Sequence, residues 1–266
     1  MNSVEKKGKI LMGLDVSTQC IGVSVIIDDG SDYGKIVELT HINPKISSKI
    51  KGIEQLFLKK KIFKEFITKY KDFGIDNVII EEPLLRSNNV NTVSTLLRFN
   101  GMVSDCIYNE LGIVPEYISS YDARKYSFPE LMAVRKFGKD EKSYDYKKVL
   151  KEIKDCKLVL FGSYPWTIDK KTVLQQKVAE IFPDIEWIYD KKGELKKENH
   201  DAADAYIALL GWLNHERYGE LNFSSEITGE SNDGNGNVEI SYDVKYWNKC
   251  EKRKTYINRL KKMDNH

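Results

Sequence analysis

The chain has 266 residues, 31% of them charged, and a formal net charge of +2. This length suits one large domain with extensions, and so small a net charge does not by itself indicate a nucleic-acid-binding protein. No apolar run approaches the roughly 20 residues of a membrane span, and the N-terminus has no signal-peptide pattern. The four cysteines form no CxxC pair, which argues against a zinc ribbon or a disulfide framework and favours a reduced, cytoplasmic protein.

Apolar periodicity predicts strands and helices that follow one another along most of the chain. Three strands form an antiparallel meander, and two later strands alternate with helices. The predicted strands are 9–14, 21–27, 35–42, 77–80 and 113–118, and the predicted helices are 53–70, 91–111, 123–126, 170–182 and one that carries Asp201. This order predicts a mixed α/β fold.

Two segments depart from the regular pattern. Residues 128–168 fit no clean period and are interpreted as an insertion within a domain that spans residues 1–219. After Tyr218 the composition shifts to Ser, Gly, Asn and Asp, which is typical of a flexible linker. Residues 220–266 are therefore expected to be a linker followed by a basic, aromatic tail.

Carboxylates lie at the ends of several predicted core elements. Asp15 follows the first strand, Glu81 follows the fourth, and the last helix opens with Asp201 and Asp204 on one face. If the first and fourth strands are neighbours, the two strand acids lie side by side and the helix can close over them. An all-oxygen set of this kind suits Mg²⁺ or Mn²⁺. Two such ions about 4 Å apart would promote phosphodiester hydrolysis.

Each acid taken alone has an ordinary explanation. Asp15 could cap a turn, Glu81 could be solvated, and the helix acids could complement the helix dipole. The joint pattern favours the metal site. A slip of one residue would exchange Glu81 for Glu82, and His200 could bind metal, transfer a proton or merely begin the helix.

Three motifs now make the chain similar to a known family. Gly13-Leu14-Asp15-Val16-Ser17, Val78-Ile79-Ile80-Glu81-Glu82-Pro83 and His200-Asp201-Ala202-Ala203-Asp204-Ala205 resemble the RuvC-type Holliday junction resolvases of the RNase H-like superfamily. The resemblance covers roughly residues 9–215. It implies a five-stranded sheet of order 3-2-1-4-5 with strand 2 antiparallel, and a homodimer. It also implies two Mg²⁺ ions per active site, replaceable by Mn²⁺. With these ions the enzyme would make paired cuts in a four-way DNA junction and leave 5′-phosphate ends. The family's catalytic metal ligands fall on Asp15, Glu81, Asp201 and Asp204.

The resemblance also suggests contacts to DNA. Arg124, Lys125, Lys170 and Lys171 resemble by position the basic residues that hold phosphates in the family, although a solvated surface role is equally compatible. Phosphate contacts give affinity and salt dependence without sequence choice. Bacterial members often carry an aromatic residue where this chain has Leu84, so the loop with Arg86 is expected to contribute instead.

Two further features bear on assembly and origin. The apolar residues of helix 91–111 are spread too widely for one buried stripe, which favours a dimer interface there. The insertion and the tail have no counterpart in compact bacterial members. They suggest a divergent phage-encoded, viral or organellar protein, acting in the host cell if phage- or virus-encoded.

Three alternative functions remain open at this point. Gly13 to Gln19 resembles the first phosphate loop of ATP-binding proteins of the actin and sugar-kinase type, but the chain is short for their two lobes. A related nuclease could act on flaps or RNA. A non-catalytic binder of branched DNA could share the fold, although the intact acid set argues against it.

Overall fold

The computed structural model describes residues 8–83, 89–128, 170–220, 222–232 and 238–247. The chain divides into two compact units, one of residues 1–123 with 174–212 and one of residues 124–173 with 213–266. The first unit contains the five-stranded sheet and all four predicted acids. Within the described ranges, no helix is both long and apolar enough to cross a membrane.

The sheet of the first unit has the strand order β3-β2-β1-β4-β5. Its strands are β1 (Lys9–Val16), β2 (Ile21–Asp28), β3 (Lys35–Ile42), β4 (Asn77–Glu81) and β5 (Glu116–Ile118). β2 pairs antiparallel with both β1 and β3, whereas β4 runs parallel to β1 and to β5. The predicted RNase H-like order and the antiparallel second strand are thereby confirmed.

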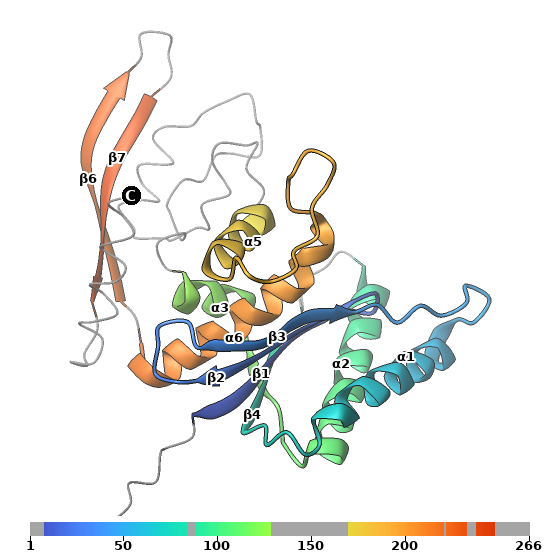
Figure 1. Cartoon of the computed structure of the whole chain (residues 1–266). Helices are drawn as coiled ribbons and strands as arrows, with labels where there is room; N and C mark the ends of the chain where they lie inside the picture. The colour runs from blue at the N-terminus through green and yellow to red at the C-terminus, as the bar shows by residue number, and fades with distance from the viewer. Residues whose placement is uncertain (1–7, 84–88, 129–169, 221, 233–237, 248–266) are drawn as a thin grey trace, which may run out of the picture. The chain divides into compact units, whose positions relative to one another are not determined.

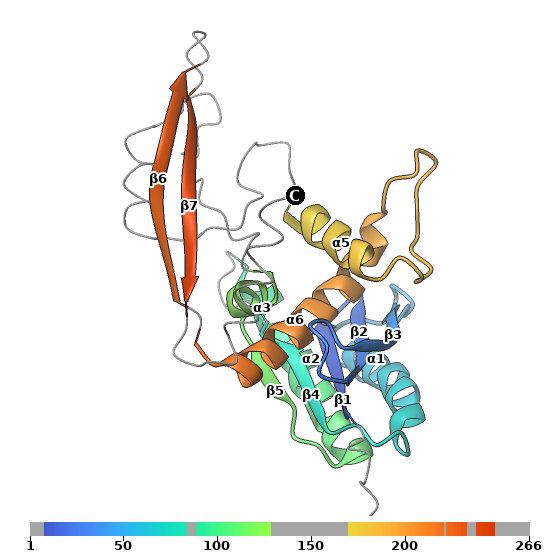
Figure 2. The ribbon, with the colours of Figure 1, turned by 60° about the vertical axis from the view of Figure 1, so that its left-hand side comes forward.

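Helices cover both faces of this sheet. The helical elements are α1 (Gly52–Ile67), η1 (Thr68–Tyr70), α2 (Val90–Leu111), α3 (Ser120–Ser127), α5 (Lys170–Ile181), η4 (Lys197–Asn199) and α6 (His200–Tyr218). Figures 1 and 2 show α1 and α2 on one face and α6 crossing the other. Glycine ends α2, because Gly112 takes the left-handed conformation that closes a helix.

The face covered by α1 and α2 is filled by large apolar side chains. Met12, Leu14 and Val16 alternate along β1 toward this face. They join one buried cluster with Phe63 of α1 and Phe99 of α2, both of which have no exposed surface. Burying each such side chain contributes roughly 1.5–3 kcal/mol, so this layer supplies much of the stability of the unit.

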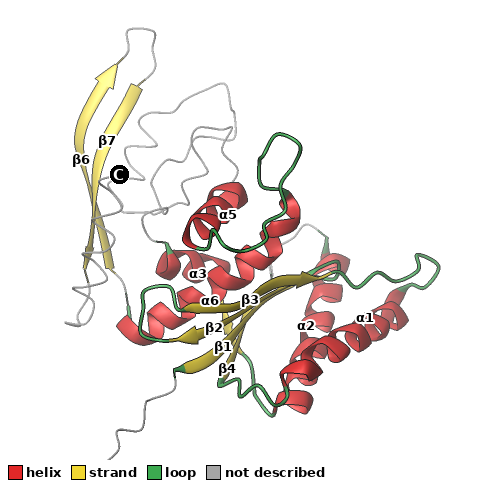
Figure 3. Ribbon diagram, in the orientation of Figure 1, coloured by secondary structure: helices red, strands yellow, loops and turns green. Residues whose placement is uncertain are grey.

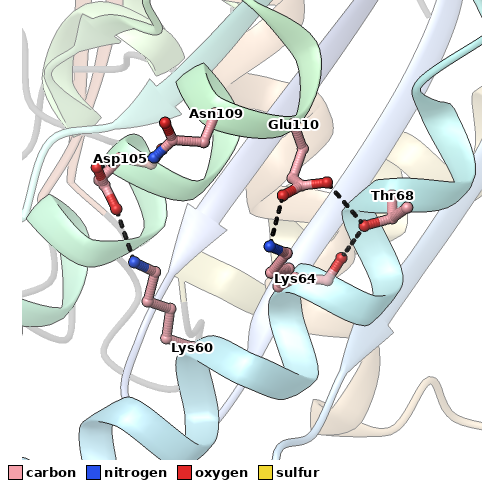
Figure 4. Close-up of polar contacts among 6 residues, drawn as sticks. All are labelled: Lys60, Lys64, Thr68, Asp105, Asn109 and Glu110. Carbon is pink, nitrogen blue, oxygen red and sulfur yellow. Dashed lines mark hydrogen bonds and ion pairs between the residues drawn. The ribbon is translucent and has the colours of Figure 1, made fainter.

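A polar seam joins α1 to α2 at the surface (Figure 4). The Lys60 ammonium lies 2.6 Å from a carboxylate oxygen of Asp105, and the Lys64 ammonium lies 2.9 Å from Glu110. The hydroxyl of Thr68 donates a further hydrogen bond of 3.2 Å to Glu110. The two helices are therefore tied together by charge outside the apolar layer.

The opposite face is built for close approach of α6. A Cβ atom added to Gly13 would overlap the carbonyl oxygen of Ala205, and one added to Gly22 would overlap that of Asp201. Only glycine lets a helix backbone come this near a strand. Small residues dominate the facing part of α6, where Ala205 is fully buried.

Some element boundaries differ from the sequence-based expectation. β1 continues two residues beyond Leu14, so Asp15 lies inside the strand and not after it. β5 contains only Glu116–Ile118, because Pro115 lacks the N–H that a sheet ladder requires. The helix predicted over residues 53–70 ends as the 3₁₀ turn η1.

The expectation of a flexible linker after residue 220 was wrong over most of its length. β6 (Asn222–Asn232) and β7 (Val238–Trp247) pair antiparallel in the second unit (Figure 3). The polar composition of residues 221–238 hid the alternation of apolar and polar residues along β7. The predicted insertion lies outside the described residues except for Phe128.

Candidate active site

Asp15 and Glu81 come from neighbouring parallel strands. Leu14 of β1 is paired with Ile80 of β4, so the next residue on each strand is one of these acids. Leu14 and Ile80 belong to the core beneath α1 and α2. Because side chains alternate along a strand, Asp15 and Glu81 face the α6 side together.

Glu82 lies on the other side of this alternation. It is exposed, and its backbone N–H donates a hydrogen bond of 2.8 Å to the carbonyl of Ile118. The geometry therefore places Glu81, and not Glu82, beside Asp15. The assignment of Glu81 as a metal ligand stays a prediction.

Asp201 is brought to the same place by the contact of α6 with β2. Gly22 is the partner of Asp15 in the β1–β2 ladder, and cross-strand partners share a face. The backbone of Asp201 lies directly on Gly22. The missing side chain of one residue thus lets the helix acid approach the strand acid.

Cys20 connects these two acids. Its thiol is hydrogen-bonded to Asp201 and lies close enough to feel the charges of both Asp201 and Asp15. Burial, that hydrogen bond and these two negative charges raise the pKa of the Cys20 thiol far above its usual range. The thiol is therefore protonated and donates its proton toward the Asp201 carboxylate. Sequence inspection did not single out this role for Cys20, because it arises from tertiary contact.

Asp204 and His200 occupy the first turns of α6. Asp204 is 4% exposed and His200 is 9% exposed, so both lie at the inner side of the helix. The structure brings Asp204 to the start of α6 with Asp201, as the motif predicts. Their roles as ligands stay predictions, as does the accessory role of His200.

Asn199 fixes the entry into α6. Its side chain accepts a hydrogen bond of 3.1 Å from the N–H of Ile188 and donates to the carbonyls of Ile188 and Lys196 at 2.9 and 3.0 Å. This side chain is 5% exposed, so the three bonds form out of water. They hold the preceding loop against the start of α6 and so fix the position of the turn that carries Asp201.

Glu81 makes a hydrogen bond of its own at the end of β4. The hydroxyl of Ser120, the first residue of α3, donates to the Glu81 carboxylate. No motif in the sequence indicates this contact, since Ser120 is 39 residues away along the chain. It orients the Glu81 carboxylate from the side of α3.

The donor set suits a hard divalent cation better than any other common metal. Carboxylate oxygens are the preferred ligands of Mg²⁺ and Mn²⁺. In the part of the chain that is described, however, no three His, Cys, Asp or Glu side chains converge closely enough to hold a metal ion. Asp15, Glu81 and the backbone of Asp201 lie at one end of the sheet, and the four acids form no closed ligand set. The chemistry of the donor set therefore fits such a cation.

The turn between β1 and β2 is held rigidly beside the acids. Ser17 and Cys20 exchange three hydrogen bonds of 2.8–3.0 Å through the Ser17 hydroxyl and both backbones. From α1, the Lys59 ammonium donates to the Thr18 carbonyl. Lys59 is only 8% exposed, and burial lowers its pKa. Sequence reasoning did not single out this contact, which joins residues 41 positions apart.

Five basic residues are predicted to contact DNA. Arg124, Lys125, Lys170 and Lys171 belong to the second unit. Lys125 lies 3.7 Å from the Glu220 carboxylate within that unit. Arg86 falls outside the described residues. The phosphate contacts of these five residues stay predictions.

Comparisons with known proteins gave matches only among solved structures. No protein-family model matches the chain, and no curated protein matches its sequence. Among solved structures, it is similar to Thermus thermophilus RuvC in complex with a Holliday junction substrate, at 10% identity over 79% of this chain and 95% of that chain, with a TM-score of 0.43. The yeast mitochondrial Holliday junction resolvase matches at 12% identity over 78% and 79%, with a TM-score of 0.41. An Aquifex aeolicus Ppx/GppA family member matches at 11% identity over 77% and 89%, with a TM-score of 0.34. The RNase H-like fold of this chain rests on the order and directions of its own strands.

Proposed function

We propose that this chain is a metal-dependent endonuclease that resolves four-way DNA junctions by paired phosphodiester hydrolysis, leaving 5′-phosphate ends. The observation that supports it most is that Asp15 and Glu81 lie on two parallel neighbouring strands, while the backbone of Asp201 packs on Gly22, the cross-strand partner of Asp15. Carboxylates are costly to gather without a cation.

In this proposal the cation ligands are Asp15, Glu81, Asp201 and Asp204. Bound Mg²⁺, or Mn²⁺ in its place, would supply an activated water and charge stabilisation for the leaving oxygen. The chain's own contribution is to hold the carboxylates. β1 and β4 fix two of them on a rigid sheet, and the start of α6 fixes the others.

Paired cuts require two active sites, and α2 offers a surface for a symmetric dimer. Val90 and Leu97 are 77% and 42% exposed, and Tyr108 is 55% exposed. With Gly101 they fall on one stripe at alternating intervals of seven, four and seven residues, as in a helix–helix seam. An added Cβ on Gly101 would meet nothing within 4 Å, so a second helix can come close there. Light scattering at working concentration tests the dimer, and a monomer would contradict concerted cutting.

The deciding experiment compares substrates and acid variants. A four-way junction, a flap, an RNA–DNA hybrid and a linear duplex are incubated with the protein in Mg²⁺ and in chelator. We expect symmetric nicks in the junction with Mg²⁺ only. Asp15→Asn and Asp204→Asn should retain junction binding and lose cleavage by about 1000-fold or more, because several kcal/mol of charge stabilisation is lost.

The control is Asp72→Asn, an exposed aspartate in the turn before β4, at the other end of that strand from Glu81. It should cut like the wild type. Mg²⁺ should also raise the unfolding midpoint of the wild type and of Asp72→Asn but not of Asp15→Asn. Cleavage at near wild-type rate by either acid variant would contradict the metal site. Preference for the flap or the hybrid would instead identify a related nuclease.

A further inference from the structure

A cleft of about 520 Å³ opens at the same end of the sheet as the acids. One wall is the turn after β1, and the other is the first turns of α2. Its lining residues are Ser17, Thr18, Gln19, Asn91, Thr92, Thr95 and Leu96. Clefts of this size are typical of small-molecule sites, and a nucleotide unit is small enough to enter.

The cleft and the acids lie on opposite faces of one strand end. Ser17 is two residues beyond Asp15, which is about 6.6 Å along an extended chain. Asp15 faces α6, whereas α2 covers the other face of the sheet. A DNA strand that placed a phosphate at the acids could therefore place a neighbouring base over the end of β1.

The lining chemistry fits a base better than a phosphate. Six of the seven lining residues have uncharged side chains that can form hydrogen bonds, and Leu96 adds an apolar surface. No lysine or arginine is among them. The first backbone donors of α2 are occupied, since the Asn89 side chain accepts from Asn91 and Thr92 at 3.1 and 3.3 Å. A nucleobase has a flat apolar face and a polar edge, which this lining matches.

Two of the side chains are suited to reading a base edge. Gln19 and Asn91 each carry an amide that can donate and accept at once. Within the described part of the chain, neither amide forms a hydrogen bond with another residue. The backbone that presents Gln19 is fixed, because the Ser17–Cys20 turn is closed by hydrogen bonds and Lys59 holds Thr18. Such preorganisation lowers the cost of binding.

We propose that this cleft binds one unpaired nucleobase next to the scissile phosphate, and that Gln19 and Asn91 set the base preference of cleavage. The inference rests on the proposed endonuclease function, which places a DNA strand at the acids. One bidentate contact between an amide and a base discriminates by about 5- to 150-fold. A preference of that size is expected at a single position of the cut strand.

The first test measures cleavage of four junctions that differ only in the base beside the cut. The wild type should prefer one base within the range given above. Gln19→Ala and Asn91→Ala should each reduce the ratio between preferred and other bases, and the double variant should bring it to within about threefold. The control is Gln176→Ala, an exposed amide on α5 outside the cleft, which should keep the wild-type ratio. An unchanged ratio in the double variant would overturn the proposal.

A second test separates the cleft from catalysis. A junction carrying 2-aminopurine at the same position is bound by Asp15→Asn protein, with no cleavage needed. Insertion of the base should change its fluorescence, and the change should be lost when Gln19→Ala and Asn91→Ala are added. A fluorescence change that persists in the triple variant would exclude this cleft as the base site. If wild-type protein cuts no junction but this signal behaves as expected, the endonuclease proposal fails while the base site stands.

Discussion

The two faces of the five-stranded sheet are packed in opposite ways. On the α1–α2 face, bulky side chains such as Phe63 and Phe99 keep the helices at the ordinary distance of an apolar layer. On the α6 face, Gly13 and Gly22 let the helix backbone rest on the strands. One face gains stability from buried area, and the other fixes distances between carboxylates.

The contrast extends to the charges on each face. Lysines and carboxylates pair at the exposed seam of α1 and α2 (Figure 4), where water screens them. On the α6 side, Asp204 is buried and the Asp201 carboxylate is hydrogen-bonded to the Cys20 thiol. The loss of a contact on the α1–α2 face should therefore leave the cleavage reaction intact. A small displacement on the α6 face should reduce cleavage before it reduces stability.

The largest expected change in stability comes from the α1–α2 face. Phe63→Ala leaves a cavity beside a fully buried ring, and such truncations cost about 3–5 kcal/mol. Urea unfolding of the variant measures this loss. Because the acids lie on the other face, the cleavage rate per folded molecule should stay within a few fold of the wild type. A loss of cleavage much greater than the loss of folded protein would contradict the separation of the two faces.

Gly22→Ala should give the reverse pattern. The added methyl group overlaps the Asp201 carbonyl, so α6 must move. Overpacking of this kind costs about 1–3 kcal/mol, while a displacement of about 1 Å at a catalytic group can cost 100-fold in rate. Unfolding curves and single-turnover cleavage of the same protein samples compare the two losses.

Ser24→Ala is the matched control for Gly22→Ala. Ser24 lies two residues further along β2 on the same face and is fully buried, and its hydroxyl forms no hydrogen bond with any described residue. Removing that hydroxyl should leave stability equal or raise it, because an unsatisfied buried polar atom is lost. Reduced cleavage in Ser24→Ala as large as in Gly22→Ala would show that any change on this face disturbs the site.

The smallest effect is expected at the seam. The Lys64 ammonium holds the pKa of the Glu110 carboxyl below its usual range. A carboxyl of this kind stabilises the fold above its unfolded pKa, and the contribution is lost as the pH falls through the folded pKa. Lys64→Met should therefore lower the unfolding midpoint slightly at neutral pH and not at acidic pH. The difference should also shrink in about 1 M salt, and one that persisted there would contradict a screened surface pair.

The sequence was sufficient to predict the sheet. Strand periodicity predicted the strands. Their order was implied by the family resemblance that the three motifs carry, and this order makes the strands of Asp15 and Glu81 neighbours. The sequence did not predict the tertiary contacts around the acids. The hydrogen bonds of Cys20 to Asp201 and of Ser120 to Glu81 join residues far apart in the chain, and no local sequence pattern indicates them.

The hairpin β6–β7 was missed for a different reason. Val238, Ile240, Tyr242 and Val244 alternate with polar residues, and Asp233-Gly234 and Asn235-Gly236 are dipeptides typical of hairpin turns. That signal was available, but the polar average of the segment outweighed it. The cleft beside β1 could not be predicted, since its two walls meet only through the fold.

The packing of α6 also limits how the chain length can vary. Asp201, Ala205 and Leu209 follow one another at four-residue intervals, and each meets Gly22 or Gly13. An inserted residue between Asp201 and Ala205 would rotate the rest of the helix by about 100° and take Ala205 off Gly13. The exposed turn at Lys191–Gly193 has no such register to keep. Insertions and deletions should therefore be tolerated in the loop before α6. Within the first three turns of α6 they should abolish activity, because they change the register of the helix on Gly22 and Gly13.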